Sequence, residues 1–346
     1  MTLQLSSQSN ADTWNSRITA NADGGNVFQS FQFAMLKQRG GWKPRFAEDN
    51  STAITILERA VPLLGKLWYI PKGPGVASLR ELDDLLPQIR LLAEKNGVFA
   101  VKIEPELIKT PETTANLLKM NLVKAPNIQP NASTVLINLS PSLDEIIASL
   151  NQKGRHAIRR AERDGVTVKR VEATDENCQQ MFQLLALTAE GNFRLRHYSY
   201  YKAFWQTYQN AGLGQLFFAY VDGAVVASAF ALVFGTKSTY KDGASVRERP
   251  AYGASHLLQW EVMKWAKEKG SLVHDLCGTP PSDKINDTSH PHYGIGRFKT
   301  SFNKQVTDYI GVYDLPIHRK RYTVWRKIGE RAVTRLHSKR HHENYY

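Results

Sequence analysis

The spacing of hydrophobic positions predicts helices and strands in alternation along the first third of the chain. Helices are expected at residues 14–20, 28–39 and 79–96. Strands are expected at residues 53–58, 66–70 and 98–104. Each helix is followed by a glycine that favours its end, at Gly24, Gly40 and Gly97. The pattern is typical of a mixed α/β (α+β) fold.

The same alternation repeats in the second half. Ser142 and Glu145 have the spacing of a capping box, which predicts a helix from there to Gly165. Further helices are expected at 176–188, 200–210 and 255–269. Strands are expected at 166–171, 215–221, 224–234, 237–242 and 272–276, with the middle three antiparallel. Strand pairs followed by a helix and a strand resemble the N-acetyltransferase-like (GNAT) architecture, of which the first half could be a degenerate copy.

Length and cysteine usage place the chain in a broad class. A chain of 346 residues exceeds the usual size of one hydrophobic core, so two domains are expected. Cys178 and Cys277 are far apart and form no C-x-x-C pair, which indicates a reducing compartment. The first ten residues lack the pattern of a signal peptide, and the longest apolar run, 225–234, is about half a membrane span. We therefore expect a cytoplasmic protein.

Positive charge is concentrated near the C-terminus. The formal net charge is +13, and residues 319–340 hold nine basic residues and one acidic one, Glu330. On a helix, one stripe is basic and consists of Lys327, Arg331, Arg335 and Lys339. A second stripe, expected to dock on the body of the protein, consists of Trp325, Ile328, Ala332 and Leu336. The basic stripe is either a solvated helix face or a surface for a phosphate-bearing partner.

Motifs for common cofactors are absent from the sequence. It contains no Walker A motif and no G-x-G-x-x-G after a strand, so ATP and dinucleotides are not expected. The turn that would cradle acetyl-CoA corresponds to Arg249-Pro-Ala-Tyr-Gly-Ala254. Tyr252 stands there in place of the glycine that lets backbone amides approach the pyrophosphate. We expect the fold without this cofactor site.

Several segments together resemble one family, the FemABX peptidyltransferases. They are Phe28-Gln-Ser30 with Lys37 and Trp42, Leu67-Trp-Tyr-Ile-Pro-Lys-Gly-Pro74, Val101-Lys-Ile-Glu-Pro105, Leu150-Asn-Gln-Lys-Gly-Arg-His-Ala-Ile-Arg159, Asp275-Leu-Cys-Gly278 and Tyr293-Gly-Ile-Gly-Arg-Phe-Lys299. They follow the family order from about residue 28 to residue 313. The resemblance implies two GNAT-like domains packed side by side. Domain 1 would comprise residues 1–139 with the C-terminal segment 314–346, and domain 2 residues 140–313.

The resemblance also implies an activity. An amino acid, Gly, Ala or Ser, would pass from aminoacyl-tRNA to the stem-peptide amine of a muramyl-pentapeptide during synthesis of the peptidoglycan cross-bridge. The acceptor would be UDP-MurNAc-pentapeptide or lipid II, and no cofactor, metal or DNA is implied. The basic residues Lys327, Arg331, Arg335 and Lys339 are expected to bind tRNA, with peripheral contact to an anionic membrane as the other interpretation. The family's long coiled arm has no counterpart here, so the compact form is expected.

The resemblance assigns catalytic roles to three residues. Lys299 would stabilise the oxyanion formed when the amine attacks the tRNA ester. Phe298 would hold that lysine by packing, or stack against the terminal adenosine of the tRNA. Glu104, at a strand end, would orient the incoming ammonium or accept its proton, with strand capping as its structural alternative.

Six further residues are expected to bind substrate: Lys37, Lys72, Arg196, Tyr200, Tyr240 and Tyr293. Lys37 would contact the pyrophosphate of the precursor, and Tyr240 the acceptor peptide, unless Tyr240 belongs to the core. Arg196 and Tyr200 have an R-x-x-x-Y spacing that would put both on one helix face. Arg194 and Tyr198 share that spacing, which leaves two registers open.

Other readings of the sequence remain. The spacing of His274, Cys277, His290 and His292 matches no familiar zinc pattern, so no metal site is expected. Two positions depart from the family: Asn303 replaces a glycine, and Asp242 replaces an aromatic residue beside Tyr240. The competing functions are an acetyltransferase that uses acetyl-CoA, and a non-catalytic RNA-binding or membrane-binding module on the same fold.

Overall fold

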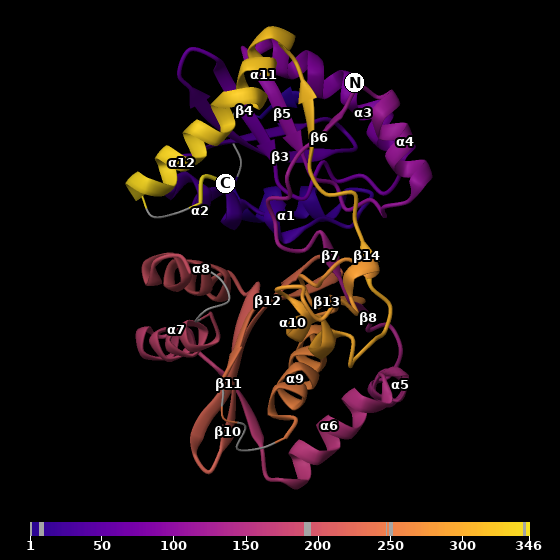
Figure 1. The fold of residues 1–346 in the computed structure, drawn as a ribbon, viewed down its shortest axis with the longest axis vertical. Helices are drawn as coiled ribbons and strands as arrows, with labels where there is room; N and C mark the ends of the chain where they lie inside the picture. Colours follow the sequence, from indigo (N-terminus) through magenta and orange to yellow (C-terminus); the bar gives the residue numbers. More distant parts are fainter. Residues whose placement is uncertain (1, 7–9, 190–194, 247, 249–251, 342–343) are drawn as a thin grey trace. The chain divides into compact units, whose positions relative to one another are not determined.

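The computed structural model describes residues 2–6, 10–189, 195–246, 248, 252–341 and 344–346. The chain forms two compact units (Figure 1). Unit 1 comprises Met1–Ala132 and Asp308–Tyr346, and unit 2 comprises Ser133–Thr307. The chain passes between the two units at 132/133 and 307/308, a few residues before the expected domain boundaries at 139/140 and 313/314.

Unit 1 is built on a twisted sheet. Among the described residues it has seven strands in the order β1-β2-β3-β4-β5-β15-β6. The strands are β1 (Gln4–Leu5), β2 (Lys43–Glu48), β3 (Ala53–Val61), β4 (Gly65–Ile70), β5 (Val98–Ile103), β6 (Val123–Lys124) and β15 (Tyr313–Pro316). β5 runs parallel to β4, and the other paired strands are antiparallel. The last part of the chain thus completes the sheet that the first part begins.

Helices cover both faces of this sheet (Figure 1). They are α1 (Ala11–Thr19), the 3-10 turn η1 (Val27–Gln29), α2 (Phe31–Arg39), α3 (Leu79–Lys95), α4 (Pro111–Lys119), α11 (Arg319–Val324), the π-helical segment η3 (Trp325–Gly329) and α12 (Glu330–His341). On one face, the leucine stripe of α3 packs against alternate residues of β3 and β5, including Ile54 and Val101. On the other, Trp14 of α1 donates to Thr55 Oγ1 at 2.8 Å, and Trp325 packs against Phe99.

Unit 2 repeats the same plan. Its described residues form a six-stranded sheet in the order β8-β13-β12-β11-β10-β9. The strands are β8 (Leu136–Asn138), β9 (Thr167–Val171), β10 (Gly214–Val221), β11 (Ala224–Phe234), β12 (Lys237–Ser245) and β13 (Val273–Asp275). The short strands β7 (Ser133–Thr134) and β14 (Thr307–Asp308) pair with each other. β10, β11 and β12 are antiparallel, as predicted.

The helices of unit 2 lie on both faces of its sheet (Figure 1). They are α5 (Leu143–Ser149), α6 (Gln152–Arg163), α7 (Asp175–Ala189), α8 (Tyr198–Asn210), α9 (Ala254–Glu268), the 3-10 turn η2 (Ser282–Lys284) and α10 (Tyr293–Lys299). Ala229 and Ala231 of β11 belong to the core that contains α9 and α6. Phe230, between them, points the opposite way and meets Phe204 and Trp205 of α8. The mixed α/β class is confirmed.

Each unit contains a parallel strand pair joined by a helix that crosses one face of the sheet. In unit 1, α3 connects β4 to β5, and in unit 2, α9 connects β12 to β13. In both units an antiparallel meander precedes this crossover and an antiparallel strand follows it in the sheet order. The repetition supports the expectation that the first half is a degenerate copy of the second, although the sequence shows no clear repeat.

Two of the expected helices are interrupted. Ser30 caps α2, so the expected helix at 28–39 is a 3-10 turn followed by a helix. The capping box of Ser142 and Glu145 is present, but its helix ends at Ser149. A new helix begins after Asn151, whose backbone N–H donates to Phe302 O at 2.8 Å. This long-range hydrogen bond explains a break that local sequence does not indicate.

The C-terminal helix forms, but its apolar stripe does not dock as expected. Trp325 is buried, whereas Ile328, Ala332 and Leu336 are exposed. The segment Trp325–Gly329 is π-helical, which adds one residue to a turn and shifts every later residue around the axis. Val333 and His337 therefore turn toward the body in place of Ala332 and Leu336. Among the described helices, none combines the length and apolar character needed to cross a bilayer.

Candidate functional site

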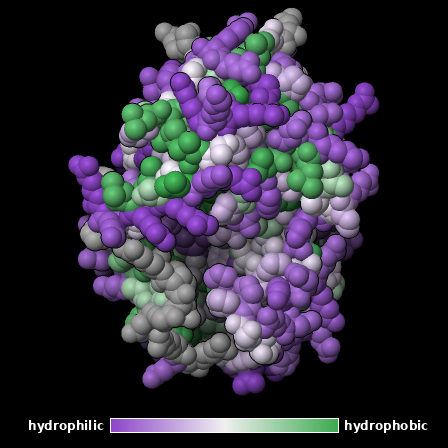
Figure 2. Space-filling model, turned by 45° about the horizontal axis from the view of Figure 1, so that its top comes forward, coloured by the Kyte–Doolittle hydropathy of each residue, from purple (hydrophilic) through white to green (hydrophobic). Residues whose placement is uncertain are grey.

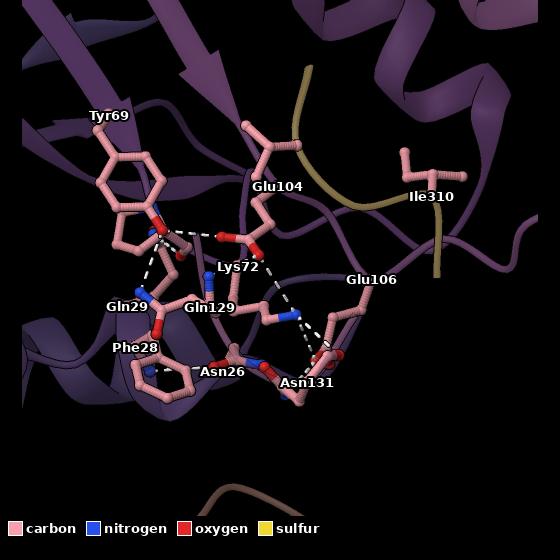
Figure 3. A network of polar contacts seen from close by, with 12 residues as sticks. Asn26, Phe28, Gln29, Tyr69, Lys72, Glu104, Glu106, Gln129, Asn131 and Ile310 are labelled. Atoms are coloured by element: carbon pink, nitrogen blue, oxygen red, sulfur yellow. Dashed lines mark hydrogen bonds and ion pairs between the residues drawn. The ribbon is translucent and has the colours of Figure 1, made fainter. Parts of the chain in front are cut away.

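A cluster of charged side chains lies at one edge of the sheet in unit 1 (Figure 3). Because β4 and β5 are parallel, their carboxyl ends emerge at the same edge. Lys72 follows β4, and Glu104 follows β5 directly. The backbone N–H of Glu104 donates to Gly73 O at 2.8 Å, which ties the two strand ends together. The fold thus brings Lys72 and Glu104 together from positions 32 residues apart in sequence.

Lys72 is held by two carboxylates. Its Nζ lies 3.7 Å from Glu104 Oε1 and 3.8 Å from Glu106 Oε1, and donates to Asn131 O at 3.2 Å (Figure 3). The side chains of Lys72 and Glu104 are each 1% exposed. The expectation for Lys72 was direct substrate binding, but its ammonium is already engaged. Its geometry is that of a residue that fixes the position of Glu104.

The second oxygen of Glu104 is also fixed. Tyr69 donates its hydroxyl to Glu104 Oε2 at 2.8 Å, and Gln129 Nε2 donates to the Tyr69 hydroxyl oxygen at 3.1 Å. Burial, and then the neighbouring Glu104 carboxylate, raise the pKa of Tyr69 well above its ordinary value. The phenol therefore stays protonated and remains a donor. Glu104 is thus held by Lys72 on one side and by Tyr69 on the other, and the sequence analysis did not single out Tyr69 as a site residue.

Several charged groups surround Glu104 in this cluster. Glu104 and Glu106 face the Lys72 ammonium, and the Glu104 carboxylate also acts on the half-buried Lys124. Burial lowers the pKa of Lys124 to about 8, and Glu104 offsets part of this effect. A carboxylate held in this way can accept hydrogen bonds from a substrate ammonium.

Lys37 lies elsewhere in unit 1, in the last turn of α2. Its side chain is buried, and its ammonium lies 5.3 Å from the centre of the Phe33 ring. This is not the solvated surface lysine that its short helix alone would suggest. The proposed contact with a pyrophosphate stays a prediction.

In unit 2, the prominent buried cation is Lys299 at the end of α10. Its side chain donates to the carbonyl oxygens of Cys277 and Gly278, the latter at 2.7 Å. Cys277 and Gly278 both have left-handed backbone conformations, with φ of 53° and 65°. The non-glycine one is strained, and it is held by the hydrogen bond from Cys277 N to Asp275 Oδ1 at 2.7 Å. The motif Asp275-Leu-Cys-Gly278 thus forms a carbonyl-lined seat for the lysine.

Burial changes the acidity of Lys299. It lowers the pKa of the ammonium from 10.5 to about 8, and the nearby Cys277 and Asp275 offset part of the effect. Most of the lysine is still cationic at neutral pH. It lies 7% exposed, and its Nζ is 5.8 Å from the centre of the Tyr240 ring. A preorganised, poorly hydrated cation of this kind stabilises a developing oxyanion effectively.

Tyr240 is placed by a β-bulge. In the pairing of β12 with β11, Tyr240 lies opposite Ala231 and Asp242 opposite Phe230, so Lys241 is the extra residue. A side chain at Gly243 would collide with the Tyr240 ring, so only glycine fits there. Burial, followed by the charge of Asp242, raises the pKa of Tyr240. The phenol is therefore a proton donor rather than a phenolate.

Lys241 is a charged residue near this site that sequence analysis missed. Its Nζ lies 3.1 Å from Asp242 Oδ1, and Asp242 Oδ2 accepts from Trp205 Nε1 at 2.9 Å. Burial lowers the pKa of Lys241, but Asp242 and the nearby Tyr200, Cys277 and Tyr201 together raise it above its ordinary value. Asp242 is therefore a structural anchor for α8 and the bulge. The bulge was the missing signal, because it cannot be read from alternation alone.

Phe298 and Tyr293 both lie on α10. The Phe298 ring packs against His256 and Phe302, at centroid distances of 5.0 Å and 5.4 Å. Carbonyl groups hold Lys299 in place, so packing by Phe298 is not required to position it. Tyr293, the first residue of the helix, lies 5.8 Å from the guanidinium of Arg297. Stacking of Phe298 with adenosine stays a prediction.

Arg196 and Tyr200 do contact each other, with the guanidinium carbon 4.6 Å from the ring centre. The reason given from sequence is wrong, because α8 begins at Tyr198 and Arg196 precedes it. Tyr198 donates to Asp175 Oδ1 at 2.7 Å, so it is committed to another partner. Arg194, the other candidate, lies outside the described residues.

A match to a family model places the chain among known proteins. The model of the FemAB family matches residues 114–224 and 215–329, which together cover more than half of the chain. The chain belongs to the FemAB family. The family predicted from the sequence is thus confirmed.

Curated and solved relatives of this FemAB protein agree with that assignment. The lipid II:glycine glycyltransferases of Staphylococcus aureus strains USA300 and MRSA252 are each 22% identical to it, over 89% of this chain and 92% of theirs. The crystal structure of FemX matches with a TM-score of 0.79 and 20% identity, covering 94% of this chain and 99% of that one. L-PGS from Bacillus licheniformis matches with a TM-score of 0.52 and 14% identity, over 92% and 96%. The chain shares the fold of FemX, in agreement with the predicted α/β class.

The histidines of this FemAB protein do not assemble a metal centre in the part of the chain that the structure describes. No group of three or more His, Cys, Asp or Glu side chains is placed there to hold an ion. His274 is fully buried, its Nδ1 lies 2.8 Å from Ser238 Oγ, and burial lowers its pKa to about 3. It is a neutral core histidine. His290 and His292 contact each other at the surface, with ring centres 5.7 Å apart.

The four cations of the C-terminal helix are exposed, as the sequence predicted. Lys327, Arg331, Arg335 and Lys339 all point to solvent. Over the described ranges, no carboxylate lies within ion-pair distance of any of them. Their charge is therefore available to an anionic partner.

Proposed function

We propose that this protein is an aminoacyltransferase that extends the stem peptide of a peptidoglycan precursor by one small amino acid. The donor is aminoacyl-tRNA, and the acceptor is the stem-peptide amine of a UDP-linked or lipid-linked muramyl-pentapeptide. Family membership supports acyl transfer, and the names of the curated relatives favour glycine as the amino acid and a lipid-linked acceptor. Alanine and serine remain candidates, because small side chains differ little in binding energy.

The observation that carries the proposal is the seat of Lys299. When an amine attacks the ester carbonyl of aminoacyl-tRNA, the carbonyl oxygen becomes an oxyanion. A buried ammonium at that oxygen lowers the barrier more than a solvated one, because its charge is not screened by water. Lys299 is such an ammonium, held by Gly278 O at 2.7 Å and still mostly charged at neutral pH.

The reaction needs no cofactor to balance. The amine nitrogen forms a bond to the ester carbon, and the bond from that carbon to the ribose oxygen of the terminal adenosine breaks. A substrate ammonium loses two protons in the reaction: one goes to a base before attack, and the second is transferred to the departing ribose oxygen. We assign Glu104 to orienting the substrate ammonium and accepting its proton, because it is a buried carboxylate whose position is fixed by Tyr69 and Lys72.

The acetyltransferase alternative loses support from the N-terminus of α9. Acetyl-CoA requires an open turn there, where backbone N–H groups can meet its pyrophosphate. In this protein Gly253, with φ of 86°, lies directly against the carbonyl of Ala157 in α6, so close that a Cβ would be 2.1 Å from that oxygen. Tyr252 beside it is exposed, and residues 249–251 of the turn lie outside the described part. Helix α6 thus packs closely against Gly253 at the start of α9.

The test is a transfer assay with labelled aminoacyl-tRNA and each of the two precursors, under single-turnover conditions. Lys299→Ala is expected to lower the transfer rate by about 10²-fold to 10³-fold, as loss of an oxyanion donor does. Lys153→Ala, which removes an exposed lysine of α6, is the matched control and should leave the rate unchanged. Equal rates for wild type and Lys299→Ala would refute the assigned role.

A further inference from the structure

The C-terminal helix presents an apolar strip to solvent. The side chains of Val324, Ile328 and Leu336 are 53%, 69% and 71% exposed, and Ala332 between them is exposed as well. The π-helical segment Trp325–Gly329 explains the exposure of Ala332 and Leu336, because it shifts the residues that follow it around the helix axis. An exposed apolar strip of this length indicates an interaction surface.

The inner side of this helix is firmly anchored to the rest of unit 1. Trp325 on its inner side is fully buried. Glu330 Oε1 lies 2.9 Å from Lys102 Nζ, and the Tyr346 hydroxyl donates to Glu330 Oε1 at 2.6 Å. Tyr322 donates to Asp314 Oδ2 at 3.0 Å from the preceding turn. A helix fixed this firmly holds its outer strip at a constant orientation.

Cations flank most of the apolar strip. Lys327 precedes Ile328, Arg331 precedes Ala332, and Arg335 precedes Leu336 in sequence, so these three apolar residues each have a cation beside them. Residues one apart on a helix are about 100° apart around the axis, so the two kinds of side chain form adjoining strips. Figure 2 shows hydrophobic groups interspersed with hydrophilic ones on the face seen when the top of Figure 1 comes forward.

A neighbouring hairpin adds to this surface. Leu63, in the turn between β3 and β4, is fully exposed. The next residue, Leu64, lies near Gly329 in the π-helical segment, and its carbonyl accepts from Arg321 at 3.5 Å. The hairpin turn and the helix therefore belong to one region of unit 1.

We infer that this region, the strip of Val324, Ile328 and Leu336 with its flanking cations, docks on an anionic lipid bilayer. The aliphatic side chains would enter the boundary between headgroups and acyl chains, while Lys and Arg side chains reach headgroup phosphates. A nucleic-acid backbone would use the cations but gain nothing from exposed isoleucine and leucine. The apolar strip therefore favours a lipid surface over tRNA for this helix. The inference does not depend on the proposed acyl transfer.

The experiment is co-sedimentation of the full chain with vesicles of phosphatidylcholine alone and of phosphatidylcholine mixed with phosphatidylglycerol. We expect binding to the mixed vesicles only, weakening as salt rises. The double variant Ile328→Ser/Leu336→Ser should lower the partition coefficient by about tenfold or more, because it removes the two most exposed aliphatic groups of the helix. Leu118→Ser, a similarly exposed leucine on α4, is the control and should bind as wild type does.

Binding of deacylated tRNA, measured with the same variants, separates the two partners. The inference predicts that Ile328→Ser/Leu336→Ser leaves tRNA affinity unchanged while it weakens vesicle binding. Absence of wild-type binding to anionic vesicles would overturn the inference. So would vesicle binding that the double variant retains in full, or a double variant that loses tRNA and vesicles equally.

Discussion

Replacing Lys299 with methionine is predicted to change how the stability of unit 2 depends on pH. Burial holds the pKa of Lys299 at about 8 in the folded protein, against 10.5 in an exposed chain. Between these pH values the unfolded chain binds more protons than the folded one, so stability rises with pH. Methionine has no proton to lose. The variant should therefore lack this rise.

The magnitude follows from the shift. From about pH 7 to about pH 9.5, the wild type should gain about 2 kcal/mol relative to Lys299→Met. For a unit of this size, Ser133–Thr307, that corresponds to about 4–8 °C in Tm. The variant also leaves the carbonyls of Cys277 and Gly278 without their ammonium donor, which costs stability at every pH. This constant loss does not affect the difference between the two pH values.

The assay is thermal unfolding of both proteins by scanning calorimetry in a series of buffers across that pH range. Lys153→Met, an exposed lysine of α6, is the control and should parallel the wild type at every pH. If wild type and Lys299→Met keep a constant difference in Tm from neutral to alkaline pH, Lys299 titrates in the same way whether folded or unfolded. The reasoning about its buried charge would then be wrong.

Three further changes test other parts of the structure. Glu104→Gln keeps the side-chain size but removes the carboxylate. The transfer rate should therefore fall by about 10²-fold with little change in Tm. An unchanged rate would exclude Glu104 from the chemistry. Gly253→Ala puts a Cβ 2.1 Å from Ala157 O at a left-handed position, and should destabilise unit 2 by about 1–3 kcal/mol in thermal unfolding; wild-type stability would mean that α6 does not press on this turn. Asp314→Asn weakens the buried partner of Lys102, 2.8 Å away, and should lower the urea midpoint by an amount equal to about 2 kcal/mol. An unaltered midpoint would show that the carboxylate of Glu330 alone is enough to stabilise Lys102.

Much of the fold could be predicted from local pattern. The strands at 215–221 and 224–234 and the helix at 255–269 have long apolar runs bounded by turn residues, and their observed bounds differ by one residue at most. The capping box of Ser142 and Glu145 was equally readable, because it depends on side chains three positions apart. Features set by neighbours in sequence are the ones that the sequence reveals.

Elements that depend on distant contacts could not be predicted in this way. Helix α10 contains two glycines, which disfavour helices, and it was not anticipated as a helix. Gly296 lies so close to Pro280 and Ile285 that a Cβ would be under 3.0 Å from both, so tertiary packing selects the glycine. The break between α5 and α6 likewise depends on Asn151 and its bond to Phe302.

In the C-terminal helix, one local irregularity makes the prediction from apolar spacing wrong. A regular helix would put Ile328, Ala332 and Leu336 on the same face as Trp325. The π-helical turn adds a residue, so the later apolar positions leave that face. Nothing in the apolar spacing signals this turn. The buried partners of Glu330 and Trp325, which fix the helix, are Lys102 and Phe99 of β5, more than 200 residues earlier in the chain.

The candidate site divides in the same way. The motifs around Glu104, Cys277 and Lys299 could be chosen from sequence because they resemble a family. Their arrangement could not, because the seat of Lys299 depends on carbonyl groups in left-handed conformations. Tyr69 and Lys241 were missed because a buried tyrosine and a bulged lysine have no distinctive local pattern.

The decisive experiment is mass spectrometry of the precursor after incubation with enzyme and charged tRNA. We expect UDP-MurNAc-pentapeptide or lipid II to gain the mass of one glycine, alanine or serine residue, and RNase to abolish the gain. A precursor that stays unmodified with every charged tRNA, while acetyl-CoA delivers an acetyl group to an amine, would contradict the proposed function.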